Sequence, residues 1–287
     1  MSKLQFLLLS VLFVLFVYPS KHFCQLGQFG FRGINSGTRN FAEVSYGIGD
    51  LNHKILNTSF NSLALNEVKL GRRTIKPIAS YKLLQFSDNY LFSSFVDDNT
   101  QSVNTSNKIS FEIWRFGLGY RKGFGYSIEN FAILPYYQMG LVWNKISLNL
   151  PHTNNFLIPD VDRPTLDHYD DNLKFGTTNV GGVDFRINPL FAIGASYETA
   201  VIFPYHKVWK QVGSFFIETL TQTGLDFLTE GVLVKQIPAV VPILYFVLKN
   251  GLSYYFFTLK QDEMNWPFKT KEPLTLEVLK FSLKITF

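Results

Sequence analysis

The chain has 287 residues, of which 46% are hydrophobic, 16% are aromatic and only 17% are charged. A soluble domain normally carries about a quarter of charged residues, so this composition argues against an ordinary soluble enzyme. It also excludes a disordered chain and, with a single cysteine, a small domain held by disulfides. The mean hydropathy of +0.07 is too low for a bundle of transmembrane helices.

Residues 1–24 predict a secretory signal peptide, because a positively charged start precedes an apolar run from Phe6 to Tyr18. As a helix, that run would reach only about 20 Å, short of the roughly 30 Å of a membrane core, which disfavours a signal anchor. Cleavage near Cys24 would leave residues 25–287 without cysteine. It would also lower the formal net charge from +5 to +3, since the segment carries two lysines and no acid. That balance does not indicate nucleic-acid binding.

The mature chain has an apolar periodicity of two, which predicts β-strands with one apolar face. In residues 114–121, large apolar side chains alternate with arginine and glycine. Eight segments share this pattern: 41–48, 63–73, 78–94, 110–121, 131–144, 176–188, 190–203 and 276–287. Two further stretches, 26–34 and 252–260, would raise the strand count from eight to ten.

The content of the two faces favours a membrane barrel over a soluble lipocalin-like barrel, whose strands also alternate. A membrane barrel has an apolar lipid face bordered by aromatic girdles, and small and polar residues inside. Eight strands leave room only for side chains, so the interior polar residues would form an ion-pair network rather than a pore. The predicted aromatic girdle comprises Trp114, Tyr120, Tyr137 and Trp143. The predicted lumen network comprises Arg115, Arg121, Asp184, Arg186, Glu198, Lys280 and Lys284.

The last strand alternates in the same way and ends on Phe287, with Phe281, Leu283 and Ile285 on the same face. This pattern resembles bacterial outer-membrane β-barrel proteins, whose terminal aromatic residue is recognised by the barrel-assembly machinery. The resemblance implies an all-β, antiparallel up-and-down membrane barrel of 8–10 strands over residues 25–287. It also implies the outer membrane of a Gram-negative bacterium, with outer-membrane lipid and the assembly machinery as partners. The phenylalanine-rich composition is similar to Bacteroidota outer-membrane proteins, and no subfamily is indicated.

Two segments depart from the strand pattern. Residues 145–175 form a predicted long external loop, in which Asp160 and Asp162 are candidate ligands for a divalent cation, although no defined ligand spacing is present. A solvated loop with no ligand is the competing interpretation.

Residues 206–250 predict an amphipathic helical insertion after the seventh strand, and hence on the external side. Glu218, Gln222, Asp226 and Glu230 recur every four residues, and a second apolar run, 239–248, is expected to stop at 249–251. Ten apolar residues are too few to cross a bilayer. The insertion would lie at the membrane interface or dock another envelope protein, because an eight-stranded lumen has no room for it as a plug.

No catalytic constellation stands out. The mature chain has four histidines, all outside the alternating strands, and only His206, near the barrel rim, suggests a lipid hydrolase, without a partner serine. No cofactor is expected. The sequence therefore predicts a non-enzymatic structural or accessory subunit of an envelope complex. A small-solute or lipid channel is the alternative, and a lipid-modifying enzyme at the rim is a further one.

Overall fold

The computed structural model describes residues 37–287 except 79–81, 99–107, 129–130, 150–158 and 160. The predicted signal peptide, the candidate strand 26–34 and the candidate ligand Asp160 lie outside the described residues.

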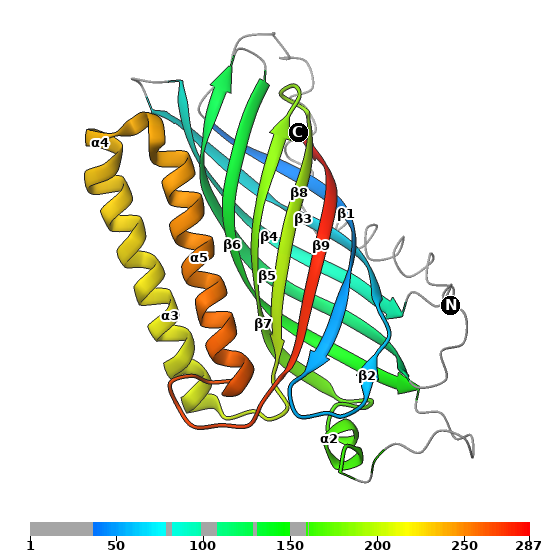
Figure 1. Cartoon of the computed structure of the whole chain (residues 1–287). Helices are drawn as coiled ribbons and strands as arrows, with labels where there is room; N and C mark the ends of the chain where they lie inside the picture. Colours follow the sequence, from blue (N-terminus) through cyan, green and yellow to red (C-terminus); the bar gives the residue numbers. More distant parts are fainter. Residues whose placement is uncertain (1–36, 79–81, 99–107, 129–130, 150–158, 160) are drawn as a thin grey trace. The chain divides into compact units, whose positions relative to one another are not determined.

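Eight antiparallel strands close into a ring, which confirms the predicted up-and-down barrel (Figure 1). Each strand pairs with the next, and the last pairs with the first. A two-residue strand, β2 (Ser59–Phe60), adds a short parallel pairing to β5. The strands of the ring are β1 (Gly37–His53), β3 (Leu63–Ile78), β4 (Leu83–Asp98), β5 (Lys108–Ile128), β6 (Phe131–Asn149), β7 (Leu173–Arg186), β8 (Phe191–Ile202) and β9 (Leu274–Thr286).

The register of the ring shows how tightly it is wound. Starting at Glu43 and following paired residues through all eight strands leads back to β1 at His53, ten positions further along the same strand. A stagger of this size in an eight-stranded ring requires strongly tilted strands, and its interior is just wide enough to be filled by side chains.

Connections differ in length between the two ends of the ring. The segments 79–82, 129–130 and 187–190 join strands at one end, the turn end, where β1 begins and β9 ends. The segments 54–62, 99–107, 150–172 and 203–273 join strands at the opposite end, the loop end. The predicted loop 145–175 is therefore shorter than expected, because β6 continues to Asn149 and β7 begins at Leu173.

An apolar cluster closes the lumen at the loop end. Its cap includes Leu166 of the short helix α2 (Arg163–Asp167) and Tyr169, whose hydroxyl accepts the backbone N–H of Leu274 at 3.0 Å. Seven of the eight strands contribute inward side chains to the cluster: Leu51, Leu63, Leu65, Val96, Ile109, Phe111, Ile113, Ile146, Leu148, Ala200, Ile202, Leu274, Leu276 and Val278.

The predicted insertion forms a helical hairpin, residues 208–262, between β8 and β9. Helix α5 contacts the outer faces of β5, β6, β7 and β8, and α3 packs against α5, so the hairpin runs along the outside of the barrel (Figure 1). Its elements are α3 (Val208–Leu228), the π-helical turn η2 (Thr229–Leu233), α4 (Val234–Gln236), the 3₁₀ turn η3 (Pro238–Val240) and α5 (Val241–Asp262).

Two expectations about the insertion are wrong. Residues 252–260, a candidate ninth or tenth strand, lie inside α5, and the helix continues through 249–251 instead of ending there. The reason is that Lys249 and Asn250 point at polar groups of α3 and of the barrel and do not face solvent. In the described part of the chain, the stretch Pro238–Asp262, with a mean hydropathy of 1.3, is long and apolar enough to cross a membrane.

Candidate functional site

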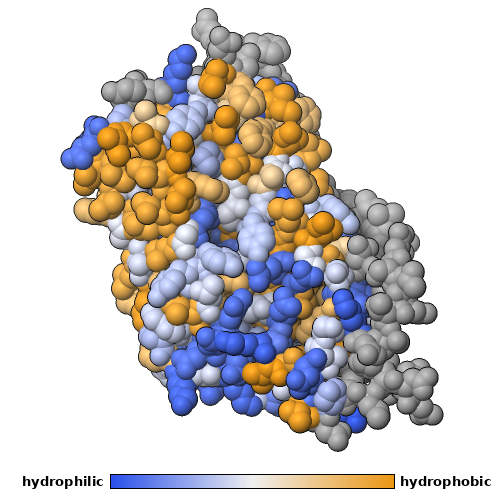
Figure 2. Space-filling model, viewed as in Figure 1, coloured by the Kyte–Doolittle hydropathy of each residue, from blue (hydrophilic) through white to orange (hydrophobic). Residues whose placement is uncertain are grey.

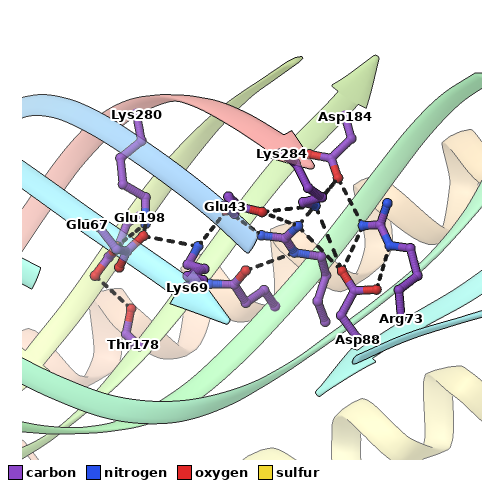
Figure 3. Close-up of polar contacts among 12 residues, drawn as sticks. Glu43, Glu67, Lys69, Arg73, Asp88, Thr178, Asp184, Glu198, Lys280 and Lys284 are labelled. Carbon is purple, nitrogen blue, oxygen red and sulfur yellow. Dashed lines mark hydrogen bonds and ion pairs between the residues drawn. The ribbon is translucent and has the colours of Figure 1, made fainter. Parts of the chain in front are cut away.

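The interior of the barrel holds a network of eleven buried charged side chains, most of which are drawn in Figure 3. They come from seven strands, and β6 adds Gln138, whose side-chain oxygen accepts a hydrogen bond from Arg121. The network has six cations and five carboxylates: Lys69, Arg73, Arg115, Arg121, Lys280 and Lys284 with Glu43, Glu67, Asp88, Asp184 and Glu198.

Arg121 is the centre of the part nearer the turn end. Its guanidinium lies 2.9 Å from Glu43, 3.4 Å from Asp184 and 3.6 Å from Asp88. Lys284 pairs with Asp184 and lies 2.9 Å from Glu43. Tyr136 faces the guanidinium of Arg121, with 4.2 Å between the ring centroid and the Cζ carbon, so aromatic and charged groups together fill this level.

Glu198 is the centre of the part nearer the loop end. Its carboxylate lies 2.5 Å from both Arg115 and Lys280, and the hydroxyl of Thr178 donates to it at 2.9 Å. Lys69 joins the two parts, since its ammonium lies 3.1 Å from Glu43 and 3.1 Å from Glu67. The apolar cluster lies on the loop-end side of this network. Together, the side chains of the network and of the cluster fill the described interior of the ring.

Six of the seven predicted lumen residues meet in this network. The exception is Arg186, which lies at the turn end and donates to the backbone carbonyls of Asn188 and Pro189 instead. Arg186 is the last residue of β7, directly before the turn, and its place on the same face as Asp184 did not indicate this different set of partners. The network members that the sequence analysis did not select are Glu43, Glu67, Lys69, Arg73 and Asp88.

A signal for three of these missed residues was present on β3. Glu67, Lys69 and Arg73 share one face of the strand at a period of two. The signal was weak because Asn66 and Arg72, on the opposite face, are also polar and make the alternation hard to see.

The predicted aromatic girdle residues have different surroundings. Tyr120 is on the outer wall and partly exposed, and Trp143 stacks on Phe116 there with 5.5 Å between ring centroids. Trp114 lies against Phe95 at 4.5 Å. Tyr137 also points outward, but it is 4% exposed because the hairpin covers it.

The outer wall beneath the hairpin carries polar side chains that a bare lipid-facing wall would not favour. Asn179 of β7 donates to Glu218 of α3 at 3.1 Å and accepts a hydrogen bond from Tyr137 at 3.1 Å. Lys122 of β5 pairs with Glu230 and lies 3.4 Å from Asp226. Of the carboxylates that recur every four residues, Glu218 and Asp226 of α3 therefore face the barrel and α5, while Glu230 of η2 is exposed but still pairs with Lys122.

The two helices of the hairpin are also paired with each other. Glu218 forms an ion pair with Lys260, and both side chains are almost completely buried. Lys249 lies 2.8 Å from Asp226 and donates to the backbone carbonyl of Gln222 at 2.6 Å. We call these contacts, together with those to Lys122 and Asn179, the outer seam.

Helix α5 approaches the barrel closely at Gly181 of β7. A Cβ atom added there would lie 2.5 Å from the side-chain oxygen of Asn250, and Asn250 donates to the backbone carbonyl of Tyr136 at 3.2 Å. Glycine is therefore what allows the helix to contact the strand backbone.

The face of the hairpin turned away from the barrel is apolar, as Figure 2 shows for its upper part. A shallow furrow of about 650 Å³ lies between the helices, lined among others by Gly224 and Gly251. The exposed apolar residues of the hairpin include Val208, Trp209, Val212, Phe216, Leu220, Phe227, Leu228, Val232, Ile237, Val240, Ile243, Val247, Leu248, Tyr254 and Tyr255.

Asp162, a candidate metal ligand from the sequence, accepts hydrogen bonds from Asn57 and Thr58. Burial opposes ionisation of its carboxyl, but hydrogen bonds from Thr58 and Asn57 lower its pKa below the usual range. The Thr58 hydroxyl donates at 2.7 Å and the two backbone N–H groups at 3.0 and 3.1 Å. These contacts hold segment 54–62 over the mouth of the lumen.

Among the described residues, no group of three or more His, Cys, Asp or Glu side chains could hold a metal ion. His206 is exposed between β8 and α3, and no serine contacts it among the hydrogen bonds of the described chain.

The chain folds as an eight-stranded antiparallel β-barrel with a helical insertion. No protein-family model and no curated protein matches it. Among solved structures, the crystal structure of Neisserial surface protein A (NspA) is similar, with a TM-score of 0.40 and 10% sequence identity over 88% of this chain and 99% of that one. A similarity of this size does not establish a shared function.

Proposed function

We propose that the protein is an integral outer-membrane protein of a Gram-negative envelope and serves as a non-enzymatic structural or accessory subunit. The observation that supports this most directly is the outer seam, which fixes a membrane-length apolar hairpin to a barrel whose interior is already filled. Each long helix has 21 or 22 residues and so reaches about 32 Å, close to the thickness of a bilayer core.

The membrane location is supported by the outer wall of the ring. On β9, the predicted assembly-signal residues Phe281, Leu283, Ile285 and Phe287 all point outward and are between 40% and 57% exposed. A soluble barrel does not favour such a continuous apolar outside with buried charges inside, whereas a lipid-facing barrel requires it. Recognition of the last strand by the barrel-assembly machinery is part of the proposal. The phenylalanine-rich composition supports a Bacteroidota envelope.

The filled lumen argues against a solute channel, and the isolated His206 argues against a lipid hydrolase at the rim. The hairpin adds an exposed apolar surface that a closed membrane barrel does not need. The partner of that surface would be another envelope protein.

The first test is electrophoresis of the tagged protein from mild-detergent extracts, with and without boiling, beside a native gel. A faster-migrating unboiled band is expected from a closed barrel, and a discrete native complex larger than the monomer is expected from a subunit. Recovery in the soluble periplasmic fraction without a shift would contradict the proposal, as would ion conductance through the purified protein in planar bilayers.

The partner surface is tested by a photo-crosslinking residue at Ile243 or Val247 of α5 on the hairpin, where the side chains are 57% and 58% exposed. The matched control is the same residue at Leu91 on the bare outer wall, where the side chain is 54% exposed. One discrete crosslinked protein from the hairpin positions and none from Leu91 is the expected result. Equal labelling by lipid at all three positions would reject the subunit role while leaving the membrane barrel in place.

A further inference from the structure

The base of the hairpin, residues 204–213 and 263–273 at the loop end, gathers lysines that have no acidic partner. Lys207, Lys210, Lys269 and Lys271 have no carboxylate within 4.0 Å in the described part of the chain. Two carboxylates, Glu263 and Glu272, lie in the same segment, so the base remains net positive. Asp262 is occupied by its ion pair with Lys54.

Contacts within the base hold these lysines near one another. The ammonium of Lys210 donates to the backbone carbonyl of Lys269 at 2.9 Å. Lys271 lies over the ring of Tyr205 and donates to its hydroxyl at 3.2 Å. Tyr205 precedes Lys207 by two residues in the sequence. Lysines 207, 269 and 271 are exposed. Figure 2 shows hydrophilic residues gathered toward the loop end, below the apolar part of the hairpin.

An apolar track begins directly beside the lysines. Trp209 is 87% exposed, and Val212, Phe216 and Leu220 follow it on the same side of α3 at helical spacing. Tryptophan concentrates where a membrane meets water, and lysine beside it interacts with anionic headgroups. In this order, the lysines lie where the phosphate groups of a lipid would be, and the aliphatic side chains lie where its acyl chains would be. Trp209 lies at the boundary between the two.

We propose that the hairpin base binds the phosphate groups of an outer-leaflet lipid, whose acyl chains lie along the exposed side of α3. The inference rests on the proposed function, because the long connections of a membrane barrel face the outside and place this base in the outer leaflet. The four ammonium groups supply positive charge, which offsets the negative charge of a lipid with two phosphates.

The experiment uses the full protein in a non-ionic detergent and native mass spectrometry, with bisphosphorylated lipid A as the probe. The test variant is K207Q/K269Q/K271Q, and the matched control, K76Q/K82Q/K235Q, removes three lysines at the opposite end. Lipid A affinity is expected to fall at least about tenfold in the test variant and to stay unchanged in the control. Dephosphorylated lipid A is expected to bind the native protein as weakly as it binds the test variant.

Folding is checked separately, and K207R/K269R/K271R is expected to bind like the native protein. If the test variant keeps its lipid A affinity, or if phosphate removal from the lipid makes no difference, the proposal is wrong. Equal competition by inorganic phosphate would show a site for free phosphate, and formation of dimers in place of the lipid complex would show an interface between copies. Both outcomes overturn it. A protein that shows the heat-dependent gel shift but no phosphate preference refutes this inference alone, whereas loss of the shift in the native protein refutes the proposed function.

Discussion

The lumen and the outer seam both bury charged side chains, but they distribute the pairing differently. In the lumen, most groups have several partners; Asp184, for example, contacts Arg73, Arg121 and Lys284. In the outer seam, Glu218 has one cationic partner, Lys260. The lumen network therefore ties seven strands together, while the outer seam attaches one hairpin through two small groups, the Glu218–Lys260 pair and the contacts of Asp226 and Glu230 with Lys122 and Lys249. This difference predicts that damage to the lumen unfolds the barrel and that damage to the seam releases the hairpin from an intact barrel.

The largest effect is expected from Arg121→Leu. The substitution leaves Glu43, Asp88 and Asp184 with too few cations in a buried site, and breaking buried pairs typically lowers the free energy of unfolding by about 3–5 kcal/mol. The measurement is the temperature or urea concentration at which the fast-migrating band is lost. Arg72→Leu on the exposed outer face is the control, and an equal loss in both variants would contradict a special role for the network.

A smaller and more local effect is expected from Lys260→Leu. It leaves Glu218 buried without its cation, which is expected to cost about 3 kcal/mol of hairpin attachment while the barrel stays folded. Hydrogen exchange of α3 and α5, compared with that of the strands, measures this. The double variant E218L/K260L is expected to recover most of the loss, because the pair is removed as a unit. Simple additivity of the two single effects would show that the pair does not act as one.

The loop-end cap offers a pH-dependent test. Because the pKa of Asp162 is lowered in the folded protein, its hydrogen bonds stabilise the cap fully above the unfolded pKa of about 3.9. That stability is lost as the pH falls through the lower folded value. The protection of the Asn57 and Thr58 amides, measured as the exchange rate relative to the intrinsic rate at the same pH, should therefore fall at acid pH in the native protein. Asp162→Asn is expected to weaken the cap by about 1–2 kcal/mol at neutral pH, and Asp167→Asn, at an exposed position, is expected to change nothing.

The smallest effect is expected from substitutions at two glycines of α3, one on the furrow and one at the base of the hairpin. At Gly224, on the furrow, no atom lies within 4 Å of an added Cβ, so Gly224→Ala is expected to stabilise α3 by about 0.5–1 kcal/mol. At Gly213 an added Cβ would meet the ring of Phe268 at 2.7 Å, and this 37% exposed ring must move aside, so Gly213→Ala is expected to stabilise the same helix less than Gly224→Ala does. Thermal unfolding of the hairpin measures both, and an equal gain at the two positions would show that the ring of Phe268 does not restrain the base.

The eight strands follow from local sequence, because alternation of apolar and polar side chains over eight or more residues is a direct property of an extended chain whose two faces meet different surroundings. The same alternation placed Arg115, Arg121, Asp184, Glu198, Lys280 and Lys284 inside the barrel before any pairing was known. It did not reveal which of these groups meet, since partners such as Glu43 and Arg121 lie 78 positions apart.

The path of the hairpin was decided by tertiary contacts. Lys249 and Asn250 look like the end of a helix in sequence, yet α5 continues through them because Gln222, Asp226 and a barrel carbonyl satisfy their polar groups. Tyr137 has the pattern of a girdle residue, and only the hairpin above it makes it a buried one. Periodicity in the sequence shows which face of a strand or helix is apolar and which is polar. Which element packs on that face depends on segments far away in the chain, and only the tertiary structure shows it.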